Sequence, residues 1–290
     1  NYFYKLVLIF KIQNMPNPND NYQVVHGWPQ LPENDSLGQV TGVSVDSHNR
    51  VFICHRGANK VRAFDGDTGK QIVSWDDTFI KNPHDVEVDG EDNLWVTDAK
   101  NQQVYKFSND GELLMTIGEL DVSGDDHDHL YGPTGVAVLA NGDFFVSDGY
   151  GNSVVHRFAA DGTHMSTWGR PGSGPGEFTT PHAITIDGRN RVLVADRENN
   201  RIQLFDRDGA YLDEWGDVYH PMDIFVDDRG LVFVTDQIPR LSLFAPDGEL
   251  IGRSRAVWNG AHGIAGNAAG DIYLAEMQPH RITRLARIAQ

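Results

Sequence analysis

Three histidines occupy equivalent positions of a repeated sequence motif in this 290-residue chain. The phrases NPHDVEVD (82–89) and TPHAITID (180–187) place His84 and His182 at the start of similar apolar strands, and His262 opens a third. Three imidazoles that converge and leave a fourth position open form a typical catalytic zinc site. The alternative is that each histidine only hydrogen-bonds its strand neighbours. The shared spacing favours metal binding, and iron, cobalt or manganese would suit the same ligands.

Two arginines and a tyrosine follow the second strands of their repeats. Arg56 and Arg197 come directly after a strand, and Tyr150 lies one residue later in its own unit. Because the second strand returns antiparallel to the first, its end shares a face with the histidines. An arginine at such a point is usually solvated or ion-paired. Beside a metal, a pair of planar guanidinium groups is better explained as a clamp for a substrate carboxylate.

The elements that must position these side chains come from a repeat of 40 to 50 residues. Each unit has an apolar strand ending in Asp, a strand ending V-x-D, a strand reaching Phe, and a last strand that often ends in Trp. Four short strands repeated six times predict an all-β, six-bladed β-propeller, because one such unit cannot cover both its faces. The six first strands start at Thr41, His84, Thr134, His182, Met222 and His262. Histidine therefore occupies every second blade, with the three rings about 120° apart around the channel.

The sixth unit supplies only three strands before the chain ends. YQVVHGW (22–28) resembles the last strands of other units, so we expect it to close the ring as the missing outer strand. The sequence thus predicts a leader or peripheral segment over 1–21 and a single propeller domain over 22–290. YKLVLIF (4–10) is too short to span a bilayer. It is expected to be a peripheral strand, a trimmed signal or an expression remnant.

Composition narrows the class of partner. The formal net charge of −17 argues against a nucleic-acid partner, since phosphate binding needs a basic surface. Cys54 is the only cysteine, so no intrachain disulfide is available. We expect a soluble monomer without a membrane span, either cytoplasmic or exported from a bacterium.

The amino-acid sequences of the repeats resemble NHL repeats, and several segments resemble a more specific family. They look like the corresponding segments of the peptidyl-α-hydroxyglycine α-amidating lyases: FICHRG (52–57), NPHDVEVD (82–89), SDGYGN (147–152), TPHAITID (180–187) and ADRENNRIQ (195–203). Those enzymes are six-bladed propellers in which three histidines hold zinc, and a tyrosine and two arginines complete the site. The resemblance implies zinc ligands at His84, His182 and His262, and further functional groups at Tyr150, Arg56 and Arg197.

The last unit departs from the family pattern. Where the family has Met-x-His-Asp, residues 260–263 of this chain are Gly-Ala-His-Gly. The family methionine lines the site, and Met222 or Met277 would have to fill that space.

The family aspartate also helps to hold a structural calcium in the channel. Its other ligands are main-chain carbonyls that match Val43 and Val86, and Gly263 supplies no carboxylate. Asp85 and Asp223 hold the equivalent register in other units. Calcium is expected here only if these two residues replace the missing ligand.

The family reaction splits an N–CH(OH)–COO⁻ unit into an amide and glyoxylate, and the resemblance implies this activity. Zinc would lower the pKa of the substrate hydroxyl, Tyr150 would act as the base, and Arg56 or Arg197 would hold the carboxylate. The expected substrate is a peptide or a small carbinolamide with a carboxylate. The alternatives are a metal-dependent hydrolase of an ester, lactone or amide, and a noncatalytic NHL interaction scaffold. Scarce channel carboxylates weaken the first, and the in-register histidines weaken the second.

Three further features lie near the predicted site. GDDHDHL (124–130) is expected to be a solvated loop rather than a metal site. Together with GRPGSGPGEF (169–178), it is a candidate lid that would exclude water. His55, beside Arg56, is expected to be a structural residue rather than a ligand.

Overall fold

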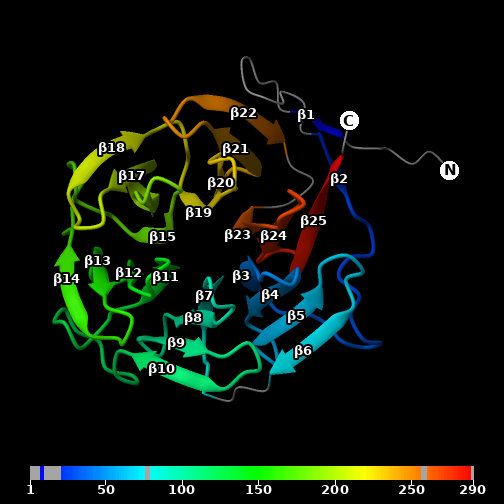
Figure 1. Ribbon diagram of the computed structural model, residues 1–290, viewed down its shortest axis with the longest axis horizontal. Coiled ribbons are helices and arrows are strands. Elements are labelled where there is room, and N and C mark those ends of the chain that lie inside the picture. Colours follow the sequence, from blue (N-terminus) through cyan, green and yellow to red (C-terminus); the bar gives the residue numbers. More distant parts are fainter. Residues whose placement is uncertain (1–6, 10–20, 76–78, 256–259, 289–290) are drawn as a thin grey trace.

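Six antiparallel sheets stand in a ring around a central axis in the computed structural model of the chain (Figure 1). The structure describes residues 7–9, 21–75, 79–255 and 260–288. The blades follow one another in chain order, and each innermost strand contacts the innermost strands of both neighbours. The predicted all-β, six-bladed β-propeller is therefore confirmed. Within the described residues, no helix has the length and apolarity needed to cross a membrane.

Each blade runs from an inner strand at the channel to an outer strand at the rim. The inner strands of blades one to six are β3 (Val40–Val45), β7 (Pro83–Val88), β11 (Pro133–Val138), β15 (Pro181–Ile186), β19 (Pro221–Val226) and β23 (Ala261–Gly266). The second strands are β4 (Arg50–His55), β8 (Leu94–Asp98), β12 (Phe144–Asp148), β16 (Val192–Asp196), β20 (Val232–Asp236) and β24 (Ile272–Glu276). The third strands are β5 (Val61–Asp65), β9 (Gln103–Phe107), β13 (Val154–Phe158), β17 (Arg201–Phe205), β21 (Arg240–Phe244) and β25 (Arg281–Ile288).

The outer strands complete the sheets. Blades one to five end in β6 (Gln71–Trp75), β10 (Leu113–Ile117), β14 (His164–Trp168), β18 (Tyr211–Trp215) and β22 (Leu250–Arg255). In the sixth sheet β2 (Asn21–Val24) pairs with β25, and β1 (Val7–Ile9) pairs with β2. A short 3-10 helix, η1 (Arg197–Asn199), follows β16. Most of the predicted leader over 1–21 lies outside the described residues.

Burial follows from the radial stacking. Five of the second strands, β8, β12, β16, β20 and β24, are buried at every residue because both of their faces meet neighbouring blades. Outer strands such as β14 alternate between half-buried and exposed residues. Six clusters of apolar side chains lie between successive blades and remove that surface from water. The ring thus holds the channel open while the core lies between the blades.

Tryptophans at the rim fix one blade to the next. Each lies against a glycine two residues before the outer strand of the following blade: Trp28 on Gly69, Trp75 on Gly111, Trp168 on Gly209 and Trp215 on Gly248. These glycines have φ between 75° and 92°. A Cβ at any of them would lie under 3.0 Å from the indole ring, so only glycine allows this close approach.

Most second strands end in a buried acidic residue. These residues hold the loops at the end of the channel where the inner strands begin. Asp148 accepts the main-chain N–H of Tyr131 at 2.8 Å, and Asp196 accepts that of Thr179 at 2.8 Å. Blade one has His55 at this point, and its Nδ1 accepts the N–H groups of Gly38 and Gly57, both at 3.0 Å. The V-x-D ending of the repeat therefore anchors the loops that carry the candidate site.

Candidate metal centre and active site

The three histidines lie at β-bulges where the inner strands of blades two, four and six begin. The ladder to the second strand shifts register between Pro83 and Asp85, between Pro181 and Ala183, and between Ala261 and Gly263. A bulge leaves its extra residue outside the ladder and re-aims that side chain. Proline, which has no N–H, is tolerated at the first residue of a strand. The bulges aim the three imidazoles into the channel, where they are 1 to 5% exposed.

The imidazole rings converge as their spacing predicts. The ring centroids of His84 and His182 are 4.6 Å apart, those of His84 and His262 4.7 Å, and those of His182 and His262 4.9 Å. One ring nitrogen from each lies within 4.8 Å of the other two. The structure therefore brings all three predicted ligands together.

Hydrogen bonds between blades set the tautomer of each histidine. Each Nδ1 contacts the main-chain carbonyl at the matching bulge of the next blade: His84 to Thr134 at 2.6 Å, His182 to Met222 at 2.8 Å and His262 to Thr41 at 2.6 Å. A carbonyl oxygen only accepts, so each Nδ1 carries the hydrogen and each Nε2 keeps its lone pair. Such carbonyl contacts orient histidines that bind metals.

Burial keeps the imidazoles neutral. It lowers the pKa of His262 to about 4, assisted by the charges of Arg56 and Arg197. Burial and the neighbouring histidines also lower the pKa of His84 and of His182 well below the ordinary value. Neutral imidazole is the form that binds metal ions. Three converging Nε2 lone pairs therefore fit a zinc ion or another divalent transition metal.

Together, His84, His182 and His262 form a histidine ring around the channel. Tyr150 lies directly over this histidine ring. Its phenol oxygen is 2.8 Å from Nε2 of His84 and 3.3 Å from Nε2 of His182. Glycines on both sides let the loop come this close. A Cβ at Gly149 would collide with the carbonyl of Pro181, and one at Gly151 with the ring of Tyr131.

The two predicted arginines approach the ring from blades one and four. Cζ of Arg197 lies 5.6 Å from the centroid of the Tyr150 ring. Nη1 of Arg56 donates to Oε1 of Gln39 at 3.2 Å, and its Nε is buried with no partner among the described residues. A buried donor of this kind is normally satisfied by a bound ligand or water. The structure thus brings the phenol, both guanidinium groups and the imidazoles to one end of the channel.

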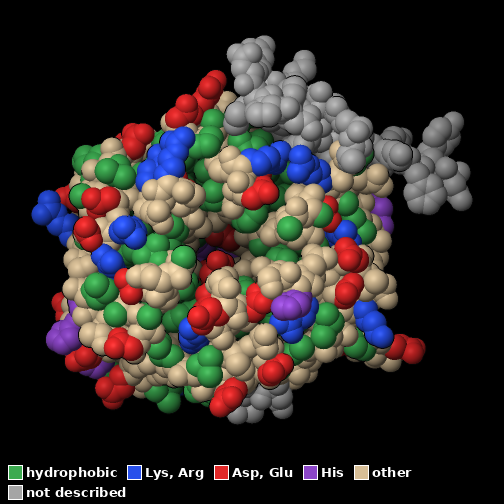
Figure 2. All heavy atoms as spheres, viewed as in Figure 1, with side chains coloured by type: hydrophobic (Ala, Val, Ile, Leu, Met, Phe, Trp, Pro, Cys, Tyr) green, Lys and Arg blue, Asp and Glu red, His purple; other side chains and the backbone are tan. Residues whose placement is uncertain are grey.

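Acidic side chains lie farther along the inner strands. They surround a cavity of about 220 Å³ that Val43, Val86, Asp85, Glu87 and Asp223 help to line. Figure 2 shows this hollow at the centre of the ring, with acidic groups at its mouth. Burial raises the pKa of Glu87 to about 8, helped by the nearby charge of Asp223, and raises the pKa of Asp223 to about 7. Oxygen donors of this kind suit Ca²⁺, and Glu87 joins the two acids singled out from the sequence.

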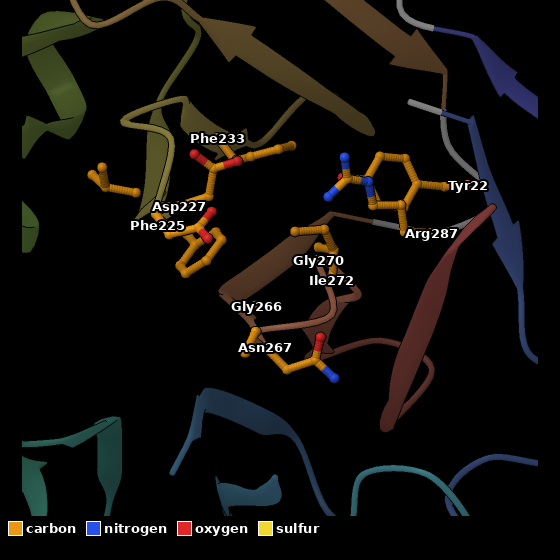
Figure 3. Close-up of a pocket in the computed structure, with 12 residues that line it drawn as sticks. Tyr22, Phe225, Asp227, Phe233, Gly266, Asn267, Gly270, Ile272 and Arg287 are labelled. Atoms are coloured by element: carbon orange, nitrogen blue, oxygen red, sulfur yellow. The ribbon is translucent and has the colours of Figure 1, made fainter. Parts of the chain in front are cut away.

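A second cavity, of about 230 Å³, opens between blades five and six near the opposite face (Figure 3). Phe225, Phe233 and Ile272 form its apolar part, and Asp227 and Arg287 lie on different sides of it. None of the six residues predicted to bind zinc or substrate lines this cavity. The predicted zinc and substrate residues therefore lie away from this cavity, at the histidine ring.

The remaining predicted features surround the ring. Met222 contributes its carbonyl to His182, and its Sδ accepts a hydrogen bond from Gln237 at 3.8 Å. In the 124–130 loop, His129 contacts Asp126 at 2.8 Å, which ties the loop to itself. The 169–178 loop is held by Arg201, which donates to the carbonyl of Gly174 at 2.8 Å. Movement of the 169–178 loop as a lid would break its bond to Arg201, whereas the contact within the 124–130 loop would survive movement of that loop as a unit.

His55 should make the fold sensitive to acid. Burial, followed by the charge of Arg62, lowers its pKa to about 4. Because this folded value lies below the unfolded value of 6.5, the stabilisation is complete above pH 6.5 and is lost as the pH falls toward 4. We expect this group to remove about 3 kcal/mol from the free energy of unfolding over that range. Urea unfolding at several pH values measures it.

The matched variant is His55→Asn, whose amide oxygen can accept the same N–H bonds without titrating. The wild type should lose more stability on acidification than this variant. Parallel pH profiles of the two proteins would contradict the assignment.

Comparison with known proteins agrees with the fold and with the resemblance. A family model described as a 6-bladed beta-propeller matches residues 129–241. The chain is 34% identical over 223 residues to peptidyl-alpha-hydroxyglycine alpha-amidating lyase 1 of Drosophila melanogaster, covering 64% of this chain and 41% of the fly protein. It is 31% identical over 245 residues to human NHL repeat-containing protein 3, covering 79% and 65%. The chain thus spans less than two thirds of either relative.

Solved structures share the architecture at lower identity. A gluconolactonase from Xanthomonas campestris superposes with a TM-score of 0.70 at 14% identity, over 92% of this chain and 90% of that one. Such a likeness shows the fold alone. The resemblance to the amidating lyases, predicted from short segments, is confirmed by the curated relatives at about 34% identity.

Proposed function

We propose that the chain is a zinc-dependent carbon–nitrogen lyase that cleaves N-acyl α-hydroxyglycine-type carbinolamides into an amide and glyoxylate. The observation that carries this proposal is the convergence of three imidazoles beneath one phenol and beside two guanidinium groups. The names of the curated relatives support a lyase. The substrate is a peptide or a smaller carbinolamide, and the enzyme acts as a monomer.

Each group has a distinct role in the proposed reaction. Arg56 and Arg197 bind the substrate carboxylate through charge-assisted hydrogen bonds. Zinc, held by Nε2 of the three histidines, would lower the pKa of a hydroxyl bound to it. The phenolic oxygen of Tyr150, as the base, accepts the hydroxyl proton while the C–N bond breaks and the C=O bond of glyoxylate forms. The phenol then returns the proton to the departing amide nitrogen, so no net proton is consumed.

The proposal predicts glyoxylate release from an N-acyl α-hydroxyglycine by protein purified without a histidine tag. Mass spectrometry of the same preparation should find about one zinc per chain, as a three-histidine site requires. The N-acyl glycine without the hydroxyl is the matched control substrate, and it should yield no glyoxylate. Hydrolysis of an ester or lactone without lyase activity would favour the hydrolase. Absence of both metal and turnover would favour a scaffold.

We further propose that a calcium ion in the channel is held by Asp85 and Asp223 with the carbonyls of Val43 and Val86. The raised pKa values of Glu87 and Asp223 support it, because protons are the alternative neutralising charge for these buried acids. A raised pKa makes these acids cost stability as the pH rises from about 4 toward 8, and a bound cation removes that cost.

Calcium should therefore raise the melting temperature at pH 8 by several degrees, and a chelator should reverse the gain. Asp223→Asn should lose this response. Asp227→Asn, directly after the same strand, is the control that should keep it. An equal calcium response in the Asp223 variant would contradict the proposed ligands.

A further inference from the structure

We infer that Glu198 is a positioning residue that aims the guanidinium group of Arg197 at the substrate carboxylate. The inference rests on the proposed function, in which Arg197 binds that carboxylate. Glu198 follows Arg197 in η1, at the loop that leaves the second strand of blade four.

The side chain of Glu198 bridges two loops. Its Oε1 lies 2.9 Å from Nε of Arg197. Its Oε2 lies 3.4 Å from Nδ1 of His220, which precedes the inner strand of blade five. One carboxylate therefore joins the arginine to the neighbouring blade.

This contact leaves one particular edge of the guanidinium group for a ligand. A guanidinium offers one edge through Nε and Nη2 and another through Nη1 and Nη2. Glu198 engages Nε of Arg197, while neither Nη atom makes a hydrogen bond to the described residues. The edge with two Nη atoms suits a carboxylate bound by two parallel hydrogen bonds. Cζ of Arg197 lies 5.6 Å from the centroid of the Tyr150 ring, so the guanidinium group lies beside the tyrosine whose phenol contacts His84.

The bridge is itself held in place. The N–H groups of Arg197 and Glu198 donate to the carbonyls of Thr180 and Thr179 at 3.1 and 3.0 Å. The ring of His220 stacks on Tyr219 with centroids 4.4 Å apart. The main-chain N–H of His220 also donates to Oδ1 of Asn200 at 2.9 Å. Glu198 thus has fixed neighbours on both sides, as a residue that orients another must have.

The negative charge of Glu198 indicates that its role is to orient Arg197, since that charge cannot attract an anionic substrate. A carboxylate beside a site for an anionic substrate repels that substrate. The side chains of Arg197 and Glu198 are 17% and 34% exposed, so their ion pair adds little to stability. Arg56 on the other side of the ring uses the neutral Gln39 as its acceptor. Glu198 therefore contributes geometry that offsets its unfavourable charge.

The test measures binding rather than turnover, on zinc-loaded protein by calorimetry. The probes are N-acetylglycine, which carries the carboxylate, and N-acetylglycinamide, which does not. Glu198→Ala should weaken binding of N-acetylglycine about 10-fold and leave the neutral probe unchanged. Glu198→Gln, which keeps an acceptor for Nε, should stay within about threefold of the wild type. Glu214→Ala removes the acid paired with Arg201 in the same blade, 2.7 Å away, and should have no effect.

A double-mutant cycle separates the possible failures. If Glu198 acts through Arg197, adding Glu198→Ala to Arg197→Ala should cause no further loss. A full loss in Arg197→Ala with none in Glu198→Ala would overturn this inference and leave the proposed function standing. No loss in Arg197→Ala would overturn both the carboxylate clamp and its positioning. Additive losses would show that Glu198 acts independently of Arg197, which also overturns the inference.

Discussion

Replacement of His182 by alanine should empty the metal site, with zinc falling from about one ion per chain to less than about a tenth. His182 supplies one of three converging nitrogens, and its ring centroid lies within 4.9 Å of both others. Two imidazoles without the third hold a divalent ion far more weakly. Since even indirect supports of a metal ligand change affinity by about 10- to 100-fold, loss of a ligand should exceed that range. Glyoxylate release should fall below detection with the metal.

The variant must be shown to fold before its metal content is interpreted. Loss of the imidazole leaves the carbonyl of Met222 without its partner at a cost of about 1–3 kcal/mol. Urea unfolding should therefore show a weaker but cooperative transition. His156→Ala removes another buried histidine, 2% exposed and outside the ring, and should keep the zinc. A His182 variant that retains stoichiometric zinc would place the metal elsewhere.

The propeller was predictable because each repeated residue has one physical task. Trp75 needs Gly111 beneath its ring, and Asp148 needs the N–H of Tyr131. These tasks recur in successive units, so the residues recur at similar spacing. The same logic explains His55, which the sequence predicts to be a structural residue rather than a ligand. Its strand ends in C-H where the others end in an acid, as T-D, S-D, A-D or A-E, and it performs the same anchoring task with an imidazole.

The histidine ring was also predictable, since equal positions in a closed ring lie at equal height. Spacing along one strand says less about side chains deeper in the channel. Asp85 was singled out from the sequence, whereas Glu87, two residues farther along β7, was not. Glu87 lines the same cavity because residues two apart on a strand share a face.

The residues that hold the side chains of Arg56 and Arg197 in place could not be predicted from the sequence. Gln39 meets Arg56 from the loop that enters blade one, and His220 reaches Glu198 from the next blade. These pairs join loops of unequal length in which the repeat pattern is lost. Their contacts depend on how each loop folds back, and spacing along the chain does not encode that path.

Removal of a single hydroxyl should separate the proposed base from the metal site. Tyr150→Phe should lower kcat for glyoxylate release by about 100-fold or more, the usual scale for loss of a positioned acid–base group. Zinc content should not change, because the three imidazoles keep their carbonyl partners. Binding of the substrate carboxylate should change little, since both arginines remain. The effect should therefore fall on kcat rather than on KM.

Tyr131→Phe provides the matched control. Tyr131 lies on the same face, 49% exposed, with its ring against Gly151. The same loss of one hydroxyl there should leave kcat unchanged, because its ring contact survives. If both variants kept full turnover, Tyr150 would be a rim aromatic that only packs.

The phenol oxygen of Tyr150 lies 2.8 Å from Nε2 of His84. Tyr150→Phe therefore also tests whether this short contact serves proton transfer or only holds the loop in place. If Tyr150→Phe lost turnover while its free energy of unfolding stayed unchanged, the contact would be shown to serve proton transfer.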